Sequence, residues 1–370
     1  MKRLIPILLL ALLLCGCSGW SNGEYHHVTP HVDDSNQSSG QNVTASDYLS
    51  LYNAMNDLVD SGAETGIIFV SRYDQNQVER DMLTAAEVVR QKNPVAAYAV
   101  DQITCELGTN SGQSAVAVKI TYNRDPRQLS KIIRVPDMKE GTALIASQLD
   151  ACADSIVLYC EKYRNVDFVQ FVEDYAAENP QLVMETPQLT VSTYPDNGTA
   201  RIVEVKFIYQ TSREVLRGYQ QQVSRIFSSA VLYVDADAVE SEKISQLYTF
   251  LMQLEDYSIV TSITPAYSLL RQGQGDSEAF ATVFAAMCRE TGLECQVVTG
   301  TRWGEAWYWN MVKDEDGWHH VDIILCSQSD GLVYRADVEM EGYVWDYEAY
   351  PQSHLPDPEP TEPVPTETTE

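Results

Sequence analysis

Basic residues are scarce in this chain of 370 residues, where 25 lysines and arginines stand against 53 aspartates and glutamates. The formal net charge is therefore -28. Proteins that bind nucleic acids or anionic surfaces neutralise the phosphates with lysine and arginine. The charge balance argues against nucleic acid and against an anionic surface as a partner. Composition is otherwise that of a globular protein, with 44% hydrophobic residues.

Cysteine patterns that bind metals are also missing, because the sequence has no CxxC pair and no zinc spacing. We expect neither a metal site nor a cofactor. Apart from two cysteines near the N-terminus, six remain, and most lie in apolar patterns typical of small core residues: Cys105, Cys152, Cys160, Cys288, Cys295 and Cys326. The sequence leaves open a disulfide between Cys288 and Cys295.

Long hydrophobic runs are absent too, and the one strongly apolar segment is shorter than a membrane span. Lys2 and Arg3 precede an apolar run from Leu4 to Leu14, and "LCGC" then ends at Cys17. This is the pattern of a secretory signal. The "LCGC" string resembles a bacterial lipobox, which implies cleavage before Cys17 and lipid on its thiol. An ordinary signal peptide or a short anchor is the alternative.

The two ends of the remaining chain have compositions that do not favour a packed core. Residues 18–45 are rich in Ser, Asn, Gly and Asp and predict a flexible tether. Its His26, His27 and His31 could bind a metal weakly, although solvated histidines are the commoner case. Residues 356–370, "PDPEPTEPVPTETTE", predict a disordered acidic tail.

Two segments between the tether and residue 235 align with each other. "KNPVAAYAVDQITCELGTNSGQSAVAVKITY" matches "ENPQLVMETPQLTVSTYPDNGTARIVEVKFIY", so that Asn93 aligns with Asn179 and Lys119 with Lys206. Each unit is predicted to form a strand, a helix and then a hairpin closed by "NSG" or "DNG". We predict two α+β modules with a packing or binding role, because neither gathers an acid, a base and a nucleophile.

The last part of the chain has a different pattern. "SEKISQLYTFLMQL" predicts an amphipathic helix, and "SEAFATVFAAMCRE" repeats apolar residues at helical spacing. Asp276 or Ser277 can cap the second helix, and Gly292 supplies a left-handed stop. "LECQVV" alternates as a strand does, and "AWYWNMV" and "GWHHVDIIL" flank a hairpin turn at "KDEDG".

This part resembles the transglutaminase-like superfamily, whose papain-like core uses Cys, His and Asp. The family pattern runs "AYxALxxGxGxCxxYAxxF", "HAWNxV" and "WxxVD". The corresponding segments here are "AYSLLRQGQGDSEAFATVF", "WYWNMV" and "WHHVD", and the resemblance covers residues 240–352. The interval from Asn310 to Asp322 matches the family interval. The later "YRADVEMEGYVWDYEAYP" looks like the tail of extracellular Firmicutes members of this group.

Two of the three family catalytic positions carry the wrong residue. Ser277 stands at the cysteine position and Trp307 at the histidine position, and only Asp322 matches. In the family, the imidazolium creates the thiolate and the aspartate orients the imidazole. A serine hydroxyl ionises far above neutral pH, and a helix dipole contributes at most ~2 kcal/mol, so Ser277 needs a base. We interpret Ser277 as a helix cap, with nothing for Asp322 to orient.

Other candidate bases are weaker still. A slip of two residues would place Glu305 at the histidine position, but it offers no imidazole. His320 shares a strand face with Asp322, yet it would approach Ser277 from the wrong strand. The acidic residues of this region could suggest a glycosidase pair, but their spacing follows the family pattern: Asp276, Glu278, Glu305 and Asp322.

Three tryptophans accompany the family positions: Trp303, Trp307 and Trp309. Trp309 matches a family tryptophan and is expected in the core. Trp307 shares its face and, by family position, is expected opposite Ser277. It either plugs the old cleft, which we favour, or stacks against a sugar ring or an extended peptide. The residues predicted to line a cleft are Glu305, Trp307, Asn310 and His320.

The sequence thus predicts an α+β protein with two tandem α+β repeat modules followed by a transglutaminase-like, papain-like domain. We expect a lipoprotein anchored to the lipid bilayer through Cys17, with an inactive domain that binds cell-wall peptide, glycan or an envelope protein. The alternative is an active peptidase or acyl transferase that uses Ser277 with a non-standard base. The predicted segments are the signal 1–17, tether 18–45, repeats 46–135 and 136–235, transglutaminase-like domain 236–355 and tail 356–370.

Overall fold

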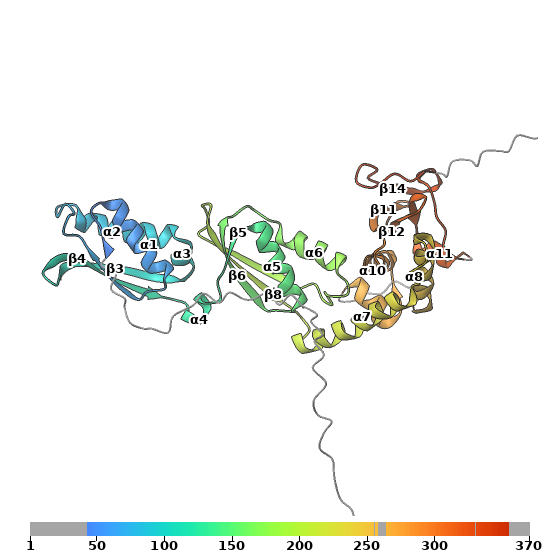
Figure 1. Ribbon diagram of the computed structural model, residues 1–370, viewed down its shortest axis with the longest axis horizontal. Coiled ribbons are helices and arrows are strands. Elements are labelled where there is room, and N and C mark those ends of the chain that lie inside the picture. Colours follow the sequence, from blue (N-terminus) through green and yellow to red (C-terminus); the bar gives the residue numbers. More distant parts are fainter. Residues whose placement is uncertain (1–42, 255, 258–263, 330, 355–370) are drawn as a thin grey trace, which may run out of the picture. The chain divides into compact units, whose positions relative to one another are not determined.

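The computed structural model describes residues 43–254, 256–257, 264–329 and 331–354, and these form a mixed α+β protein (Figure 1). Cys17, the histidines of the predicted tether and the predicted acidic tail lie outside the described residues. Of the helices within the described ranges, none combines the length and the apolar character that a bilayer crossing needs.

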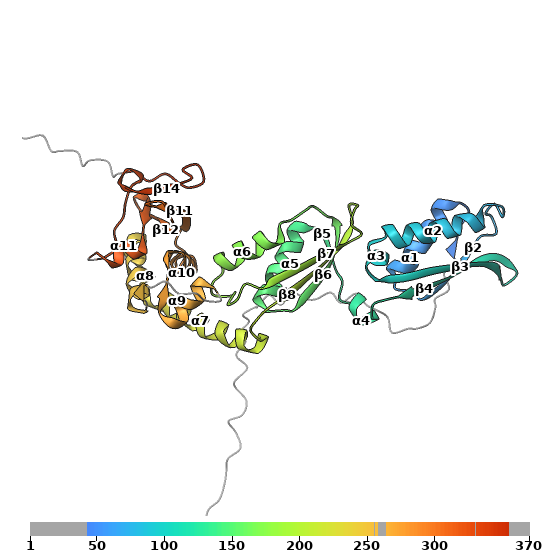
Figure 2. The same ribbon diagram turned by 180° about the vertical axis from the view of Figure 1, so that it is seen from behind.

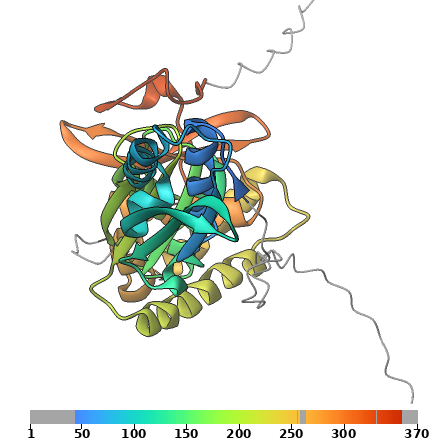
Figure 3. The same cartoon turned by 90° about the vertical axis from the view of Figure 1, so that its left-hand side faces the viewer.

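The first sheet has the strand order β1-β2-β4-β3 and carries its helices on one face, as the blue helices and teal strands of Figure 3 show. Its elements are β1 (Val43–Thr44), α1 (Tyr48–Asp60), β2 (Thr65–Phe69), α2 (Val78–Lys92), α3 (Pro94–Ala99), β3 (Val100–Asn110) and β4 (Gln113–Tyr122). Leu51 and Met55 of α1 pack with Ile68 of β2 in its core. Because β1 pairs with β2, the predicted tether ends before Val43 rather than at residue 45.

The second sheet has the strand order β5-β6-β8-β7. Its elements are α4 (Pro126–Leu129), β5 (Ile133–Asp137), α5 (Met138–Asp150), β6 (Ser155–Lys162), α6 (Phe168–Glu178), β7 (Gln188–Tyr194) and β8 (Arg201–Ile208). Asp137 and Asp167 begin α5 and α6, because their carboxylates accept hydrogen bonds from the first free backbone amides.

The two sheets share one plan. In each, a parallel strand pair (β1 with β2, β5 with β6) is followed by an antiparallel hairpin whose second strand inserts beside that pair. Lys119 of β4 lies opposite Thr65 of β2, and Lys206 of β8 lies opposite Ser155 of β6. The lysines aligned by sequence therefore occupy equivalent positions. The leading strand and helix of each sheet, β1 with α1 and β5 with α5, were not predicted.

Two predicted boundaries differ from the structure. The boundary between residues 135 and 136 would cut β5, which pairs with β6 along its length, so the second module begins earlier. Helix α7 (Arg213–Tyr233) was assigned to the second repeat, but its buried residues Leu216, Val223 and Phe227 belong to the same apolar core as α8 and α10. An amphipathic pattern predicts a buried face and does not identify the partner that covers it.

The C-terminal domain has a sheet of order β13-β12-β11-β14, with α10 packed beneath it beside α8 and α9 (Figure 2). The predicted helices, strand and hairpin are all confirmed here. After α7 come α8 (Glu240–Leu254), β9 (Asp256–Tyr257), α9 (Pro265–Gln272), β10 (Gln274–Gly275), α10 (Ser277–Glu290), β11 (Cys295–Arg302), β12 (Glu305–Asp314), β13 (Gly317–Val321), α11 (Ile323–Ser327), the 3-10 helix η1 (Asp337–Glu339) and β14 (Tyr343–Trp345).

Candidate functional site

The start of α10 is built by the glycine-rich approach. Gly273 ends α9 in the left-handed conformation with φ 67°, and a Cβ on Gly275 would lie 2.8 Å from the Cβ of Ala279. The Asp276 carboxylate then caps α10 by accepting a hydrogen bond of 3.0 Å from the Ala279 amide. Asp276 is therefore the cap, and the interpretation of Ser277 as the cap was wrong, since Ser277 is the first residue of the helix.

Ser277 is enclosed, with 7% of its surface exposed. Its hydroxyl oxygen accepts a hydrogen bond of 3.3 Å from the backbone amide of Tyr308 on β12. Within the part of the chain that the structure describes, no side-chain base hydrogen-bonds to this hydroxyl. The serine therefore lacks the partner that would remove its proton.

Asp322 is buried, at 1% exposure, and its carboxylate is fully engaged. One oxygen accepts hydrogen bonds of 2.8 Å from the Trp307 indole N–H and of 2.6 Å from the Tyr343 hydroxyl. The other oxygen accepts a bond of 3.1 Å from the Leu325 amide and so caps α11. The expectation that Asp322 has nothing to orient was wrong, because the indole N–H binds it.

An indole can satisfy this carboxylate but cannot continue the chain of proton transfer. Imidazole carries two ring nitrogens, so one can donate to an aspartate while the other accepts a proton from the nucleophile. Indole has a single N–H, which only donates. The Trp307–Asp322 pair thus keeps the hydrogen bond that would orient a catalytic imidazole, but it contains no group that can accept a proton from Ser277.

The Trp307 ring packs into the domain and is partly covered. It is half-buried and packs against the two apolar clusters of the domain, those of α10 and of Trp309. The guanidinium carbon of Arg302 lies 5.3 Å from the Trp307 ring centre and 5.7 Å from that of Tyr343. Burial and the neighbouring Asp322 carboxylate raise the pKa of Tyr343, so that its hydroxyl stays a donor. These contacts agree with a ring that fills space.

His320 is locked into the core at 1% exposure. Its Nδ1 accepts a hydrogen bond of 2.9 Å from the Trp309 indole, so the proton is on Nε2, which lies 2.9 Å from an Asp337 oxygen. Burial lowers the pKa of His320, and the bond to Asp337 opposes that shift in part. Both nitrogens are used, so His320 has none left for Ser277.

The residues predicted to line a cleft do not come together. Glu305 is exposed at the start of β12, whereas Asn310 is fully buried and donates a hydrogen bond of 2.9 Å to the Ala281 carbonyl oxygen in α10. His320 lies inside the aromatic cluster and Trp307 packs against Arg302. Asn310 faces the opposite side of β12 from Trp307. His320 is enclosed at 1% exposure, so the predicted cleft is wrong.

Two cavities have linings that contain none of the three family positions. One of about 460 Å³ is lined by Glu278, Thr282 and Tyr308 beside Glu173 and Asp174 of α6. Burial, with a smaller effect from Asp276, raises the pKa of Glu278. Neither this cavity nor the larger one has a histidine or cysteine in its lining.

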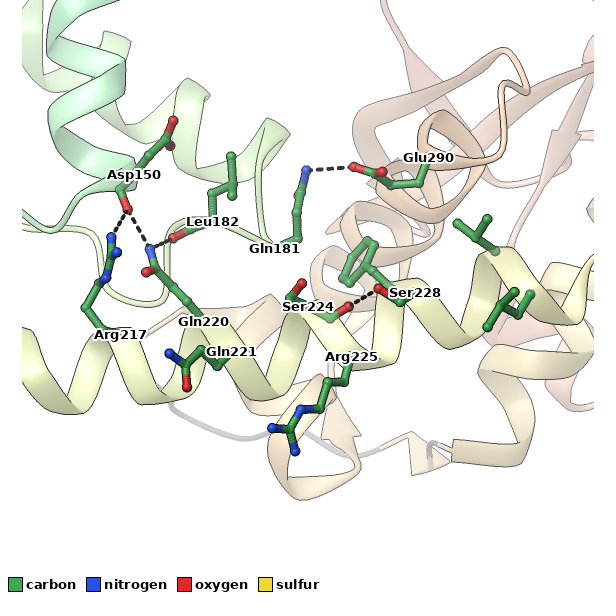
Figure 4. Close-up of a pocket in the computed structure, with 13 residues that line it drawn as sticks. Asp150, Gln181, Leu182, Arg217, Gln220, Gln221, Ser224, Arg225, Ser228 and Glu290 are labelled. Carbon is green, nitrogen blue, oxygen red and sulfur yellow. Dashed lines mark hydrogen bonds between the residues drawn. The ribbon is translucent and has the colours of Figure 1, made fainter. Parts of the chain in front are cut away.

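The larger cavity, of about 950 Å³, runs along α7 (Figure 4). Figure 4 shows the Gln220 amide donating hydrogen bonds to the carbonyl oxygens of Asp150 and Leu182 at one end. Arg225 and Ser228 also line it. None of the family positions takes part in its lining, so it offers no chemistry at the predicted site.

The six described cysteines are free thiols, including Cys288 and Cys295, so the disulfide that the sequence left open is not formed. Burial raises the pKa of Cys288. Cys295 accepts a hydrogen bond of 3.5 Å from the Asn310 amide. Among the described residues, no three His, Cys, Asp or Glu side chains are grouped as a metal site would require.

His320 predicts a pH dependence of stability. Its pKa is lowered in the folded protein, so the unfolded chain binds the proton more readily and stability falls as pH drops below the ordinary histidine range. His320 contacts the Trp309 indole, the Asp337 carboxylate and the Trp345 ring, and the charge of the adjacent His319 also disfavours its protonation. The urea midpoint of unfolding should decrease as the pH is lowered from 7.5 to 5.5. In His320→Gln the midpoint should depend less steeply on pH. Parallel slopes would contradict the assignment.

Comparison with known protein families identifies one match in this chain. A model of the transglutaminase-like superfamily matches residues 230–323, a range that begins inside α7 and contains Ser277, Trp307 and Asp322. Residues 230–323 therefore form a transglutaminase-like domain. No curated protein matches the sequence.

Among solved structures, the chain is similar to one described as a TGase, with 12% identity and a TM-score of 0.27, covering 51% of this chain and 55% of that one. A candidate cysteine protease from Cytophaga hutchinsonii has 11% identity and a TM-score of 0.25, covering 43% and 70%. A candidate protease from Parabacteroides distasonis has 9% identity and a TM-score of 0.23, covering 59% and 35%. The chain thus spans about half the length of the first of these structures.

Proposed function

We propose that the transglutaminase-like domain at residues 230–323 is catalytically inactive, and that the protein serves a binding or structural role at the cell envelope. The observation that carries the proposal is the hydrogen bond of 2.8 Å from the Trp307 indole to Asp322. This bond uses the carboxylate that would orient a catalytic imidazole, and it supplies no group that accepts a proton.

The nucleophile position supports the same proposal. Ser277 is nearly enclosed, and its hydroxyl oxygen already accepts the Tyr308 amide. An alcohol becomes a useful nucleophile only when an adjacent base takes its proton. His320 is held by Trp309 and Asp337 and cannot act as that base from its place in the core.

Turnover assays test the proposal. Purified protein is incubated with peptide amides, with thioesters and with glutamine-containing peptides plus a primary amine, and release and transfer are followed by mass spectrometry. We expect no turnover above the buffer rate, and no difference between wild type and Ser277→Ala. Turnover by the wild type that disappears in Ser277→Ala would instead support an active serine-dependent acyl transferase or peptidase.

The location of the protein is proposed from its N-terminus. The "LCGC" string after a basic start and an apolar run supports lipid attachment at Cys17, which would place the folded part on the extracellular face of the membrane. The two similar α+β sheets would then extend a binding surface there, for cell-wall peptide or glycan or for an envelope protein.

Lipid attachment has a direct test. Cells expressing the protein are fed radiolabelled palmitate, and the purified chain should carry the label. Cys17→Ser should carry none, because the thiol is the acceptor. Equal labelling of both proteins would show that the lipid is attached elsewhere or that the label is non-specific.

A further inference from the structure

Trp303 sits at the tip of the hairpin between β11 and β12 in a conformation that disfavours its residue type. Its φ is 52°, and that of Gly304, the next residue, is 87°. Two-residue hairpin turns with both φ angles positive prefer Asn-Gly, and bulky side chains rarely adopt this region. A large aromatic residue held there at an exposed tip is an outlier of the kind that marks functional positions.

The Trp303 indole packs against the backbone of Gly342. The Trp303 amide donates a hydrogen bond of 2.8 Å to the Gly342 carbonyl oxygen. A Cβ on Gly342 would lie 2.5–2.7 Å from three atoms of the indole, so one face of the ring rests against the glycine backbone. Gly342 also has a positive φ of 82°. Glycine is required there both for its conformation and for the space that the ring occupies.

The other face of the ring is open, because Trp303 remains 68% exposed. Val344, two residues after Gly342 and paired with Thr301 across the sheet, is 63% exposed. Glu305 and Glu341, which are adjacent in the sequence to the turn and to the glycine, are both exposed. Arg302 turns inward over Trp307. Trp303 therefore presents an open aromatic face, and exposed acidic residues lie close to it in the sequence.

We propose that Trp303 is a stacking platform for a pyranose ring of a neutral or amino-sugar glycan. Sugar rings present a face of C–H groups that packs on an indole while their hydroxyls stay solvated or hydrogen-bonded to a polar border. A buried aromatic side chain contributes roughly 150–250 Å². The open part of one indole is thus far smaller than the ~800 Å² per partner of a stable protein interface. The two nearby carboxylates and the charge of -28 also disfavour an anionic lipid surface.

This site is separate from the family positions, so it does not depend on whether Ser277 is active. Trp307, for which the sequence left stacking as the alternative to a plug, has Arg302 over its ring, whereas Trp303 is 68% exposed. Loss of glycan binding and the presence of turnover are therefore independent outcomes.

The test is a titration of the purified protein with the hexamer of β-1,4-linked N-acetylglucosamine and with the hexamer of β-1,4-linked glucose, followed by tryptophan fluorescence and saturation-transfer NMR. We expect saturable binding of at least one hexamer. Trp303→Ala should weaken it by about tenfold or more, and Trp303→Phe by less, because phenylalanine keeps a smaller stacking face. Leu83→Ala, at an apolar residue of α2 that is 59% exposed, is the matched control and should bind as the wild type does.

Several results would overturn the proposal. Equal affinities of wild type and Trp303→Ala would show that the ring does not stack, and absence of binding to both hexamers would remove the glycan assignment. Sedimentation with phosphatidylcholine vesicles that depends on Trp303 would assign the surface to a membrane instead. Self-association that Trp303→Ala abolishes would assign it to a second copy of the chain. Circular dichroism confirms that each variant is folded.

Discussion

Trp307→Ala is expected to lower the free energy of unfolding by about 3–5 kcal/mol. The change removes a half-buried ring that packs against two apolar clusters and under the Arg302 guanidinium. It also removes the indole N–H that donates to the buried Asp322 carboxylate. The carboxylate then retains the hydrogen bond from the Tyr343 hydroxyl. Chemical denaturation of wild type and variant, with unchanged denaturant slopes, measures the difference.

The matched variant is Trp307→Phe, which keeps most of the apolar volume and loses the indole N–H. It should cost about 1–3 kcal/mol, the usual cost of leaving a buried polar group without its partner. The difference between the two variants then separates packing from hydrogen bonding. If Trp307→Ala melts within a degree or two of the wild type, the ring does not fill the old cleft and must serve another role.

Restoring both missing family residues should restore a reactive thiol, whereas restoring one should not. In Ser277→Cys the thiol gains only the helix N-terminus and stays mostly protonated near neutral pH. In Ser277→Cys combined with Trp307→His, an imidazole at position 307 can donate to Asp322 with one nitrogen and stabilise the thiolate with the other. Alkylation by iodoacetamide at pH 6.5 should be faster in the double variant by on the order of tenfold.

The pH profile of alkylation is the informative measurement. The double variant should react with an apparent pKa well below that of the single variant, and Asp322→Asn in the double background should raise it again. Trp307→His alone, which has no thiol at position 277, controls for the native cysteines. Identical profiles of the single and double variants would show that position 307 does not face the start of α10.

Much of the C-terminal domain could be predicted because its signals are local. Asp276 supplies the cap of α10 and Gly292, with a φ of 78°, supplies its stop. The alternation of "LECQVV" and the turn at "KDEDG" likewise predict β11 and the β12–β13 hairpin. These features depend on neighbouring residues alone, which is why their bounds were close to those observed.

The site itself depends on contacts that no local pattern encodes. The sequence shows Trp307 at a histidine position, but whether its N–H reaches Asp322 depends on how β12, β13 and α11 are placed. Asn310 and His320 are buried in the folded domain, so neither lines the predicted cleft. Trp303 was visible in the sequence, yet its role as an exposed ring depends on Gly342, far along the chain.

The central claim is that the Trp307–Asp322 pair leaves Ser277 without a base. The most direct measurement is incubation of the wild-type protein with a fluorophosphonate probe at neutral pH, followed by intact-mass and peptide mass spectrometry. A hydroxyl that is not activated should remain unmodified, so we expect no probe on Ser277 and the same spectrum for Ser277→Ala. Stoichiometric modification of Ser277 that is lost in Ser277→Ala would contradict the account and show an active serine in this domain.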